Sequence, residues 1–320
     1  MRTLALCFFL ILVISADAAD FKIEETEAAI VITNGKNAVL TYHKTVVDPP
    51  AEADPIYKRS GFIFPLHTPS GGVVTGIHPD DHYHHLGLWH AWVETKFDGA
   101  KIDFWNLKKG TGRVRFGKTL ETKSDGKSAG FSVIQEHIGY LGEAKTETVI
   151  LEETFTVSVS AADDGAAYLV DYTTAQKNIT TKPLELPAYR YGGCLAWRAP
   201  FSWDNRTNSN YLTSEGLDKE ESHTSRASWI AMHGPVDEAK NPGTLAILIH
   251  KKNHDFPQRL RTWNDPKNGK MFLCVVPVQE HPWAIEPAKT ETMRYRLVVS
   301  DGKPDAKKIE SAWKSWVEEG

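Results

Sequence analysis

The residues best suited to chemistry lie in one short stretch, 78–92, which contains five of the thirteen histidines in the chain. Histidine is the side chain that exchanges a proton near neutral pH or binds a metal ion as a neutral imidazole. His82, His84, His85 and His90 fall within nine residues. Such clustering is more typical of a functional site than of scattered structural histidines. We therefore expect the chemistry of the protein to centre on this stretch.

The stretch is predicted to run from a loop into a strand. A proline and two aspartates before it indicate the loop. If 83–93 is a strand, successive side chains alternate between its two faces. His84 then shares one face with His90, and His85 shares the other face with Trp89. His84 and His85 can therefore serve one site only if the junction between loop and strand is irregular.

Three interpretations of this cluster remain open. In the first, two or three histidines line a pocket as acid, base or hydrogen-bond donors, and Trp89 or Trp92 stacks on a sugar ring. In the second, His82, His84 and His90 bind a divalent metal together with an aspartate of the loop. In the third, the imidazoles are structural and bond to loop carbonyls and nearby aspartates.

Familiar catalytic motifs do not accompany the cluster. The histidine stretch contains neither an HExxH helix motif nor a GxSxG elbow, so it supports neither a zincin nor an α/β-hydrolase. We see no organic cofactor motif and expect no cofactor in the leading hypothesis. Cys194 and Cys274 have no CxxC spacing. They could form a disulfide in an oxidising compartment or remain buried thiols.

Other polar clusters are candidates to join the histidines. Arg190 and Arg198 lie in a segment rich in tyrosine and tryptophan, where a guanidinium could bind hydroxyl or carboxylate groups. His250 and Asn253 follow an apolar run that reads as a strand, a usual place for site residues carried on loops. Glu280 lies in a third cluster and is a possible acid/base partner for a histidine.

The elements that must position these residues are mostly strands. Apolar and polar residues alternate in several runs, and Asn34-Gly35 between two of them is a strong hairpin signal. Strands are expected at 29–33, 38–42, 148–160, 168–172, 245–250, 271–276 and 294–300. Only the tail, about 304–319, has apolar residues at helical spacing. The pattern predicts a mainly β fold, an antiparallel β-sandwich, with a C-terminal helix.

The ends and the charge narrow the class of protein. Residues 1–18 resemble a secretory signal peptide, with a basic start, an apolar run and small residues before the expected cleavage point. We expect 19–320 to form a single domain that is secreted or periplasmic, because no later stretch is apolar enough to span a membrane. The formal net charge is -4 and no basic stripe is present, so nucleic acid is not an expected partner.

The histidine stretch and several other segments resemble the bacterial PmoA family of secreted proteins. The similar segments are 64–71, 81–89, 102–105, Gly192-Gly193 with Arg198, 250–257 and 294–296. Leu86 departs from the polar residue that the family has there. The resemblance implies a galactose mutarotase-like supersandwich and a role in sugar or polysaccharide metabolism, where histidine and glutamate act as acid and base. No mutarotase motif matches residue by residue, so the resemblance assigns no catalytic position.

We therefore predict an exported carbohydrate-active protein with an open cleft on one sheet. In the leading hypothesis it is an enzyme, an epimerase or mutarotase-like enzyme, a lyase or a hydrolase, whose acid/base groups are His84, His85 and Glu280. The expected substrate-binding residues are His82, Trp89, His90, Arg190, Arg198, His250 and Asn253. A non-catalytic carbohydrate-binding envelope protein and a metal enzyme built on the histidine cluster are the alternatives.

Overall fold

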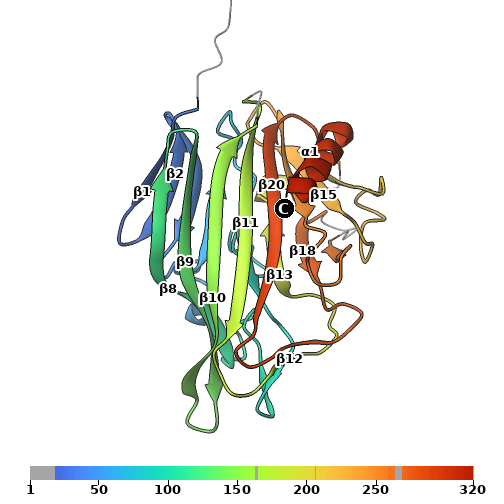
Figure 1. Cartoon of the computed structure of the whole chain (residues 1–320). Coiled ribbons are helices and arrows are strands. Elements are labelled where there is room, and N and C mark those ends of the chain that lie inside the picture. The colour runs from blue at the N-terminus through green and yellow to red at the C-terminus, as the bar shows by residue number, and fades with distance from the viewer. Residues whose placement is uncertain (1–18, 163–164, 206, 264–268, 320) are drawn as a thin grey trace, which may run out of the picture.

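The computed structural model describes residues 19–162, 165–205, 207–263 and 269–319. Within these residues the chain forms two eight-stranded antiparallel sheets, a four-stranded antiparallel sheet and a C-terminal helix. Figure 1 shows the long strands of one large sheet in front of the other, with the helix beside β15 (Trp229–Pro235) and β20 (Thr290–Asp301). The predicted signal peptide, 1–18, lies outside the described residues.

The first sheet carries the strand that follows the histidine stretch. Its strands, in spatial order, are β1 (Phe21–Glu25), β2 (Ala29–Asn34), β3 (Asn37–His43), β4 (Phe62–Leu66), β5 (Leu88–Ala91), β13 (Gly193–Arg198), β18 (Phe272–Val276) and β17 (Arg259–Thr262). The β2–β3 hairpin turns at Gly35, whose φ of 56° confirms the predicted Asn-Gly turn. β5 lies in the middle of this sheet, between β4 and β13.

The second sheet supplies the opposite layer. Its strands, in spatial order, are β14 (Asn210–Thr213), β15 (Trp229–Pro235), β16 (Pro242–Ile249), β20 (Thr290–Asp301), β11 (Ala167–Asn178), β10 (Thr146–Ala161), β9 (Ser128–Leu141) and β8 (Gly112–Ser124). The small sheet consists of β19 (Trp283–Ile285), β12 (Leu184–Leu186), β6 (Thr95–Phe97) and β7 (Ala100–Ile102). Two short 3-10 helices, η1 (Pro55–Tyr57) and η2 (Phe201–Trp203), lie in connections.

Aromatic side chains join the two large sheets. Tyr42 of β3 lies 5.1 Å, between ring centroids, from Phe131 of β9 and 5.9 Å from Phe155 of β10. Phe155 in turn contacts Tyr172 of β11 at 4.6 Å. All four side chains are buried, so each sheet turns one face toward a shared core. The mainly β, antiparallel sandwich that the sequence predicts is confirmed.

The C-terminal helix covers the outer face of the second sheet. α1 (Ala306–Glu319) buries Ile309 against Trp229 and Leu248 of that sheet. The Trp313 indole donates a hydrogen bond of 2.9 Å to the carbonyl of Ile249. The predicted helix is therefore present and begins at 306 rather than 304. In the part of the chain that the structure describes, no helix has the length and apolar character to cross a membrane.

The predicted strand over 83–93 is wrong, because only 88–91 is a strand and turns precede it. The backbone N–H of His82 donates to the carbonyl of Pro79 at 3.0 Å, and that of His85 donates to the carbonyl of His82 at 2.9 Å. Gly87, at φ 62°, then leads into β5. A Cβ at Gly87 would lie 2.2 Å from the carbonyl oxygen of Ile63, so only glycine fits this approach to β4.

Candidate functional site

The turns bring three imidazoles together. The ring centroids of His84 and His85 are 4.7 Å apart, those of His82 and His85 5.0 Å, and those of His82 and His84 5.5 Å. A regular strand would have pointed His84 and His85 to opposite sides. The irregular junction that a shared site requires is therefore present.

An aromatic wall stands behind these histidines. His85 is 2% exposed and stacks on Phe272 of β18 at 4.7 Å. Trp89 of β5 lies 5.1 Å from His85 on the same side of the sheet. His82 meets Trp263, just beyond β17, edge to face at 4.7 Å. His85 is therefore packed into this wall, whereas His82 and His84 lie half-buried in front of it.

Neighbouring cavities open in front of this wall. One of about 370 Å³ is lined by His82, His223, Arg261, Trp263, Lys270, Asp81 and Thr262. A second, of about 300 Å³, is lined by His84 together with Tyr57, Tyr189, Tyr191 and surrounding polar residues. A third, of about 410 Å³, is lined by Tyr189, Arg190, His223, Arg261, Glu280 and their neighbours. Because the third cavity shares residues with each of the others, the three form one open region, which we call the histidine cleft.

Burial keeps the imidazoles of this cleft neutral. It lowers the pKa of His84 to about 3, and the nearby charges of His82 and Arg59 act in the same direction. Burial also lowers the pKa of His82, although the carboxylate of Asp81 opposes the shift. The pKa of His85 lies well below its usual value, again through burial first. Each neutral ring can therefore accept a hydrogen bond at one nitrogen and donate one from the other.

Asp81 is placed to orient His82. Its carboxylate lies 3.3 Å from Nδ1 of His82 and forms an ion pair with Lys270. Burial works to raise the pKa of Asp81, but the hydrogen bond from Lys270 and the proximity of His82 outweigh it and lower the pKa. The negative charge of Asp81 stabilises the protonated form of His82 and so opposes the effect of burial. This arrangement makes His82 a candidate base.

His90 lies on the opposite face of β5 and does not belong to the cleft. Its Nε2 is 2.5 Å from Oε2 of Glu153, and its Nδ1 is 2.7 Å from the hydroxyl of Tyr172. Nε2 of His137 contacts the same Glu153 oxygen at 2.7 Å. We call these four residues, with Arg59, the interior cluster. The expectation that His90 binds substrate beside His84 is not supported, because alternation along β5 turns His90 into the core.

Within the interior cluster, His90, His137 and Glu153 form the one group of three histidine, cysteine or acidic residues in the described part of the chain whose possible metal-binding atoms lie within 4.8 Å of one another. Its spacings of 2.5 and 2.7 Å are hydrogen-bond distances, however, and are shorter than the roughly 3.3 Å between ligands on a tetrahedral zinc ion. Arg59 donates to the carbonyl of His90 at 2.8 Å and brings a positive charge alongside. The geometry is that of a charge-balanced hydrogen-bond network. The alternative metal set of His82, His84 and His90 does not form.

Three more predicted residues lie near the cleft in constrained positions. Trp89 is 1% exposed, so it forms the wall and offers no open face to a ligand. Arg198 is fully buried, where it donates to the carbonyl of Met271 at 2.8 Å and pairs with Asp204. Glu280 lines the third cavity, but hydrogen bonds from Arg259 and Arg226 lower its pKa to about 2. Glu280 is therefore a bound carboxylate and a poor proton donor.

Arg190 reaches the cleft, whereas the 250–253 segment lies elsewhere. Arg190 lines the third cavity from the loop between β12 and β13. His250 contacts Trp316 of α1 at 5.0 Å, on the outer face of the second sheet. The side chain of Asn253 bonds to both backbone polar groups of Arg294. These two residues have structural partners and are not brought to the histidines.

The sequence analysis missed several lining residues. Tyr191 and Arg261 contribute an aromatic face and a cation, and His223 contributes an imidazole. The strand register explains why Arg261 lies on the cleft side of the first sheet. Arg261 pairs with Cys274 on β18, and Cys274 pairs with Ala196 on β13. Ala196 in turn pairs with Trp89. Arg261 was not predicted as a site residue because the strand 259–262 is too short to show the alternation of apolar and polar residues that indicates a strand. Cys194 and Cys274, the cysteines among the described residues, are free and buried.

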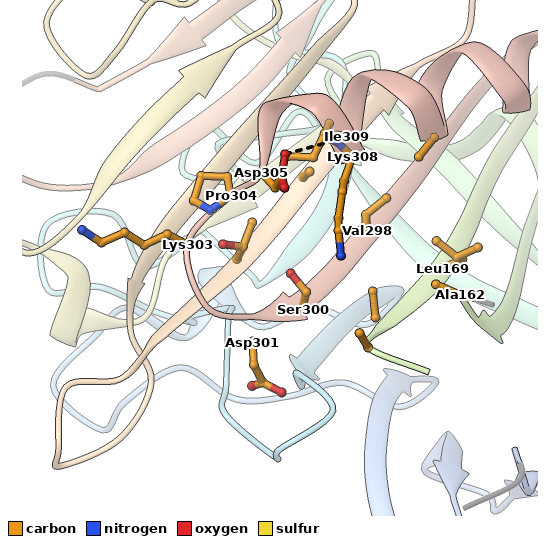
Figure 2. A pocket seen from close by; sticks show the side chains of 15 residues that line it. Ala162, Leu169, Val298, Ser300, Asp301, Lys303, Pro304, Asp305, Lys308 and Ile309 are labelled. Carbon is orange, nitrogen blue, oxygen red and sulfur yellow. Dashed lines mark hydrogen bonds between the residues drawn. The ribbon is translucent and has the colours of Figure 1, made fainter. Parts of the chain in front are cut away.

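Another cavity, of about 270 Å³, lies beneath α1 (Figure 2). Leu169, Val298 and Ile309 line it together with Ser300 and several other small or apolar side chains. The polar groups around it, shown in Figure 2, belong mainly to the turn that leads into the helix. No histidine lines this cavity, and it lies on the outer face of the second sheet. The histidine cleft is therefore the better candidate site.

The fold and the site define a class: an antiparallel β-sandwich protein with an open cleft lined by histidine, tyrosine and arginine. The chain belongs to a family of unknown function (DUF6807), whose model matches residues 29–314. The comparisons do not confirm the resemblance to the PmoA family, and no curated protein matches.

Solved structures with a similar fold include galactose mutarotase-like proteins. That from Lactobacillus casei is 8% identical, with a TM-score of 0.39, and the match covers 87% of this chain and 99% of that one. The galactose mutarotase related enzyme from Lactobacillus acidophilus is 8% identical, with a TM-score of 0.38, over 88% of this chain and 97% of that one. The protein from Clostridium acetobutylicum is 12% identical, with a TM-score of 0.37, over 89% and 100%.

Proposed function

We propose that this chain is an exported carbohydrate-active enzyme in which His82 acts as the acid/base group of the histidine cleft and His84 orients the substrate. The observation that carries the proposal is that two neutral imidazoles, those of His82 and His84, lie 5.5 Å apart on an open cleft with tyrosine walls, with His85 packed behind them. Tyrosine faces beside a few convergent polar groups suit a sugar, which has both apolar and hydroxyl surfaces. His85 supports the other two histidines from behind.

His82 and His84 have different functions because their charged surroundings differ. Asp81 beside His82 stabilises a protonated ring, so His82 is the stronger base of the pair. His84 has no such carboxylate partner in the structure, and burial keeps its pKa at about 3. It therefore remains a neutral hydrogen-bonding group that orients a hydroxyl. A proton removed from the sugar goes to His82 and can be returned to the same or another sugar atom.

The test is a comparison of turnover and binding in His82→Gln and His84→Gln across a panel of mono- and oligosaccharides. Glutamine keeps a hydrogen-bonding amide but cannot accept a proton. We expect turnover by His82→Gln to fall by about 100-fold or more, with ligand binding changed only a few-fold. His233→Gln is the matched control, because His233 lies on β15 of the second sheet.

The pH profile supplies a second readout. An ordinary histidine base loses activity as the pH falls through about 6.5. The lowered pKa of His82 moves that loss to lower pH, so turnover should begin to fall at a lower pH than it would with an ordinary histidine base. Turnover unchanged in both variants would remove these residues from the mechanism. Equal loss of turnover and binding would favour a non-catalytic carbohydrate-binding protein.

A further inference from the structure

Two arginines converge on one tyrosine in the histidine cleft. The guanidinium carbon of Arg190 lies 5.4 Å from the ring centroid of Tyr191, and that of Arg261 lies 5.6 Å from the same centroid. Arg190 comes from the loop before β13, and Arg261 comes from β17. Each guanidinium gains a cation–π contact from the ring. The ring therefore holds two like charges close together at the cleft surface.

Neither arginine has a carboxylate partner among the described residues. The neighbouring Arg226 and Arg259 differ in this respect, because both bind Glu280. Burial and the charge of Arg190 both lower the pKa of Arg261, as expected for a half-buried cation that lacks a counter-ion. An arginine pair of this kind is costly unless an anion occupies the space between or beside the two guanidinium groups.

The remaining charges around these arginines leave an excess of positive charge. Asp81 and Glu280 are the acids that line the two cavities containing Arg261. Asp81 is bound by Lys270, and Glu280 is bound by two arginines. His223 lines both cavities, and its Nδ1 is buried without a hydrogen-bond partner among the described residues. An anion entering here would meet two guanidinium groups that have no carboxylate partner among the described residues, and the free Nδ1 of His223.

We propose that Arg190 and Arg261 form an anion-binding subsite and that the sugar substrate carries an oxyanion, as a uronic carboxylate or a sulfate ester. Both groups present coplanar oxygen pairs that match the planar fork of a guanidinium. The adjacent faces of Tyr189 and Tyr191 would hold the ring that bears the anion. This inference rests on the proposed function, because it names the class of sugar bound in the same cleft.

The test measures the binding of matched saccharide pairs to the full chain by calorimetry. One pair is an oligouronide and its carboxyl-reduced form, and the other is a sulfated oligosaccharide and its desulfated form. We expect the anionic member of one pair to bind at least about 10-fold more tightly at low salt. The preference should shrink as salt is raised, because ions screen the partly exposed arginines. The pair that shows the preference identifies the oxyanion.

Arg190→Gln and Arg261→Gln locate the effect. Each should remove most of the preference, because it weakens the binding of the anionic member far more than the binding of the neutral member. Arg115→Gln is the control, because it removes the same charge from β8, where Arg115 pairs with Glu136 and Glu147. Arg190 is exposed, so its variant keeps the test sound even if Arg261→Gln fails to fold.

The outcomes separate this inference from the proposed function. Equal affinity within both pairs, or a preference that survives both arginine substitutions, overturns the subsite while saccharide binding still supports a sugar cleft. If inorganic sulfate binds in a manner that depends on Arg261 but no saccharide binds, the result supports the anion-binding subsite and refutes the proposal that the substrate is a sugar. Absence of both kinds of binding overturns both proposals.

Discussion

Substitution of Glu153 tests how much the interior cluster contributes to the free energy of unfolding. Glu153 is fully buried between the sheets and accepts hydrogen bonds from His90 and His137. Burial alone would raise its pKa, but the charge of His90 and the two hydrogen bonds lower it from 4.5 to about 2. A shift of that size corresponds to about 3 kcal/mol of stability at neutral pH. We therefore expect Glu153→Gln to lower the free energy of unfolding by about 3 kcal/mol or more at pH 7.

The substitution also removes a negative charge that acts on Arg59. Burial already lowers the pKa of Arg59 to about 10. Removing one partner of a buried ionic arrangement typically costs about 3–5 kcal/mol, whereas removing both can be almost neutral. Arg59→Met combined with Glu153→Gln should therefore recover part of the loss. Glu152→Gln is the matched control, because Glu152 is the preceding residue of β10 and is exposed.

The assay is urea unfolding followed by fluorescence, repeated between pH 7 and pH 3. The contribution of Glu153 is fully present above its unfolded-state pKa of 4.5 and disappears as the pH falls through its folded-state pKa of about 2. About 2 kcal/mol of the difference between wild type and variant should therefore be lost by pH 3. A loss below about 1 kcal/mol at pH 7, or a difference that does not change with pH, would refute this account of the interior cluster.

Two further substitutions test the elements that hold the site and the helix, both by urea unfolding. Gly87→Ala should cost at least about 3 kcal/mol, because its Cβ would lie 2.2 Å from the Ile63 carbonyl oxygen at a φ of 62°. Gly35→Ala, with a similar φ and open space, should cost only about 1 kcal/mol, and equal costs would contradict the close approach. Ile309→Ala should cost about 2 kcal/mol by opening the contact between α1 and Trp229. Lys307→Ala is the control for Ile309→Ala, because Lys307 is exposed. If Ile309→Ala and Lys307→Ala both retain ligand binding, that result would agree with a binding site on the first sheet.

Much of the fold could be predicted because its long strands repeat a simple pattern. Buried residues alternate along 148–160, and the observed β10 extends that run by only two residues at the start and one at the end. The helix was predictable for a similar reason, since Ile309, Trp313 and Trp316 recur at helical spacing on the face that meets the second sheet. In these elements one local pattern decides both the element and its buried face.

The site was less predictable because it depends on contacts between distant residues. The partner of His90 is Glu153, which lies 63 residues further along the chain, and nothing local marks that pairing. The backbone at 82–85 forms hydrogen-bonded turns, so its side chains do not alternate between two faces as they would in a strand. The turns, and not a strand, direct His84 toward the cleft. Arg261 enters only through the register of β17, β18 and β13. The histidine stretch was recognisable from its composition, whereas its division between cleft and core was not.

β5 has a consequence for how mutational data on this protein should be interpreted. Its consecutive residues Trp89 and His90 face opposite ways, one into the wall of the cleft and the other into the interior cluster. A library scored only by activity would rank both positions as equally important, although one loss would arise from a deformed binding surface and the other from a reduced folded population. The amount of folded protein and its activity must therefore both be measured for every variant in the library. Two residues that are neighbours in β5 need not have the same function.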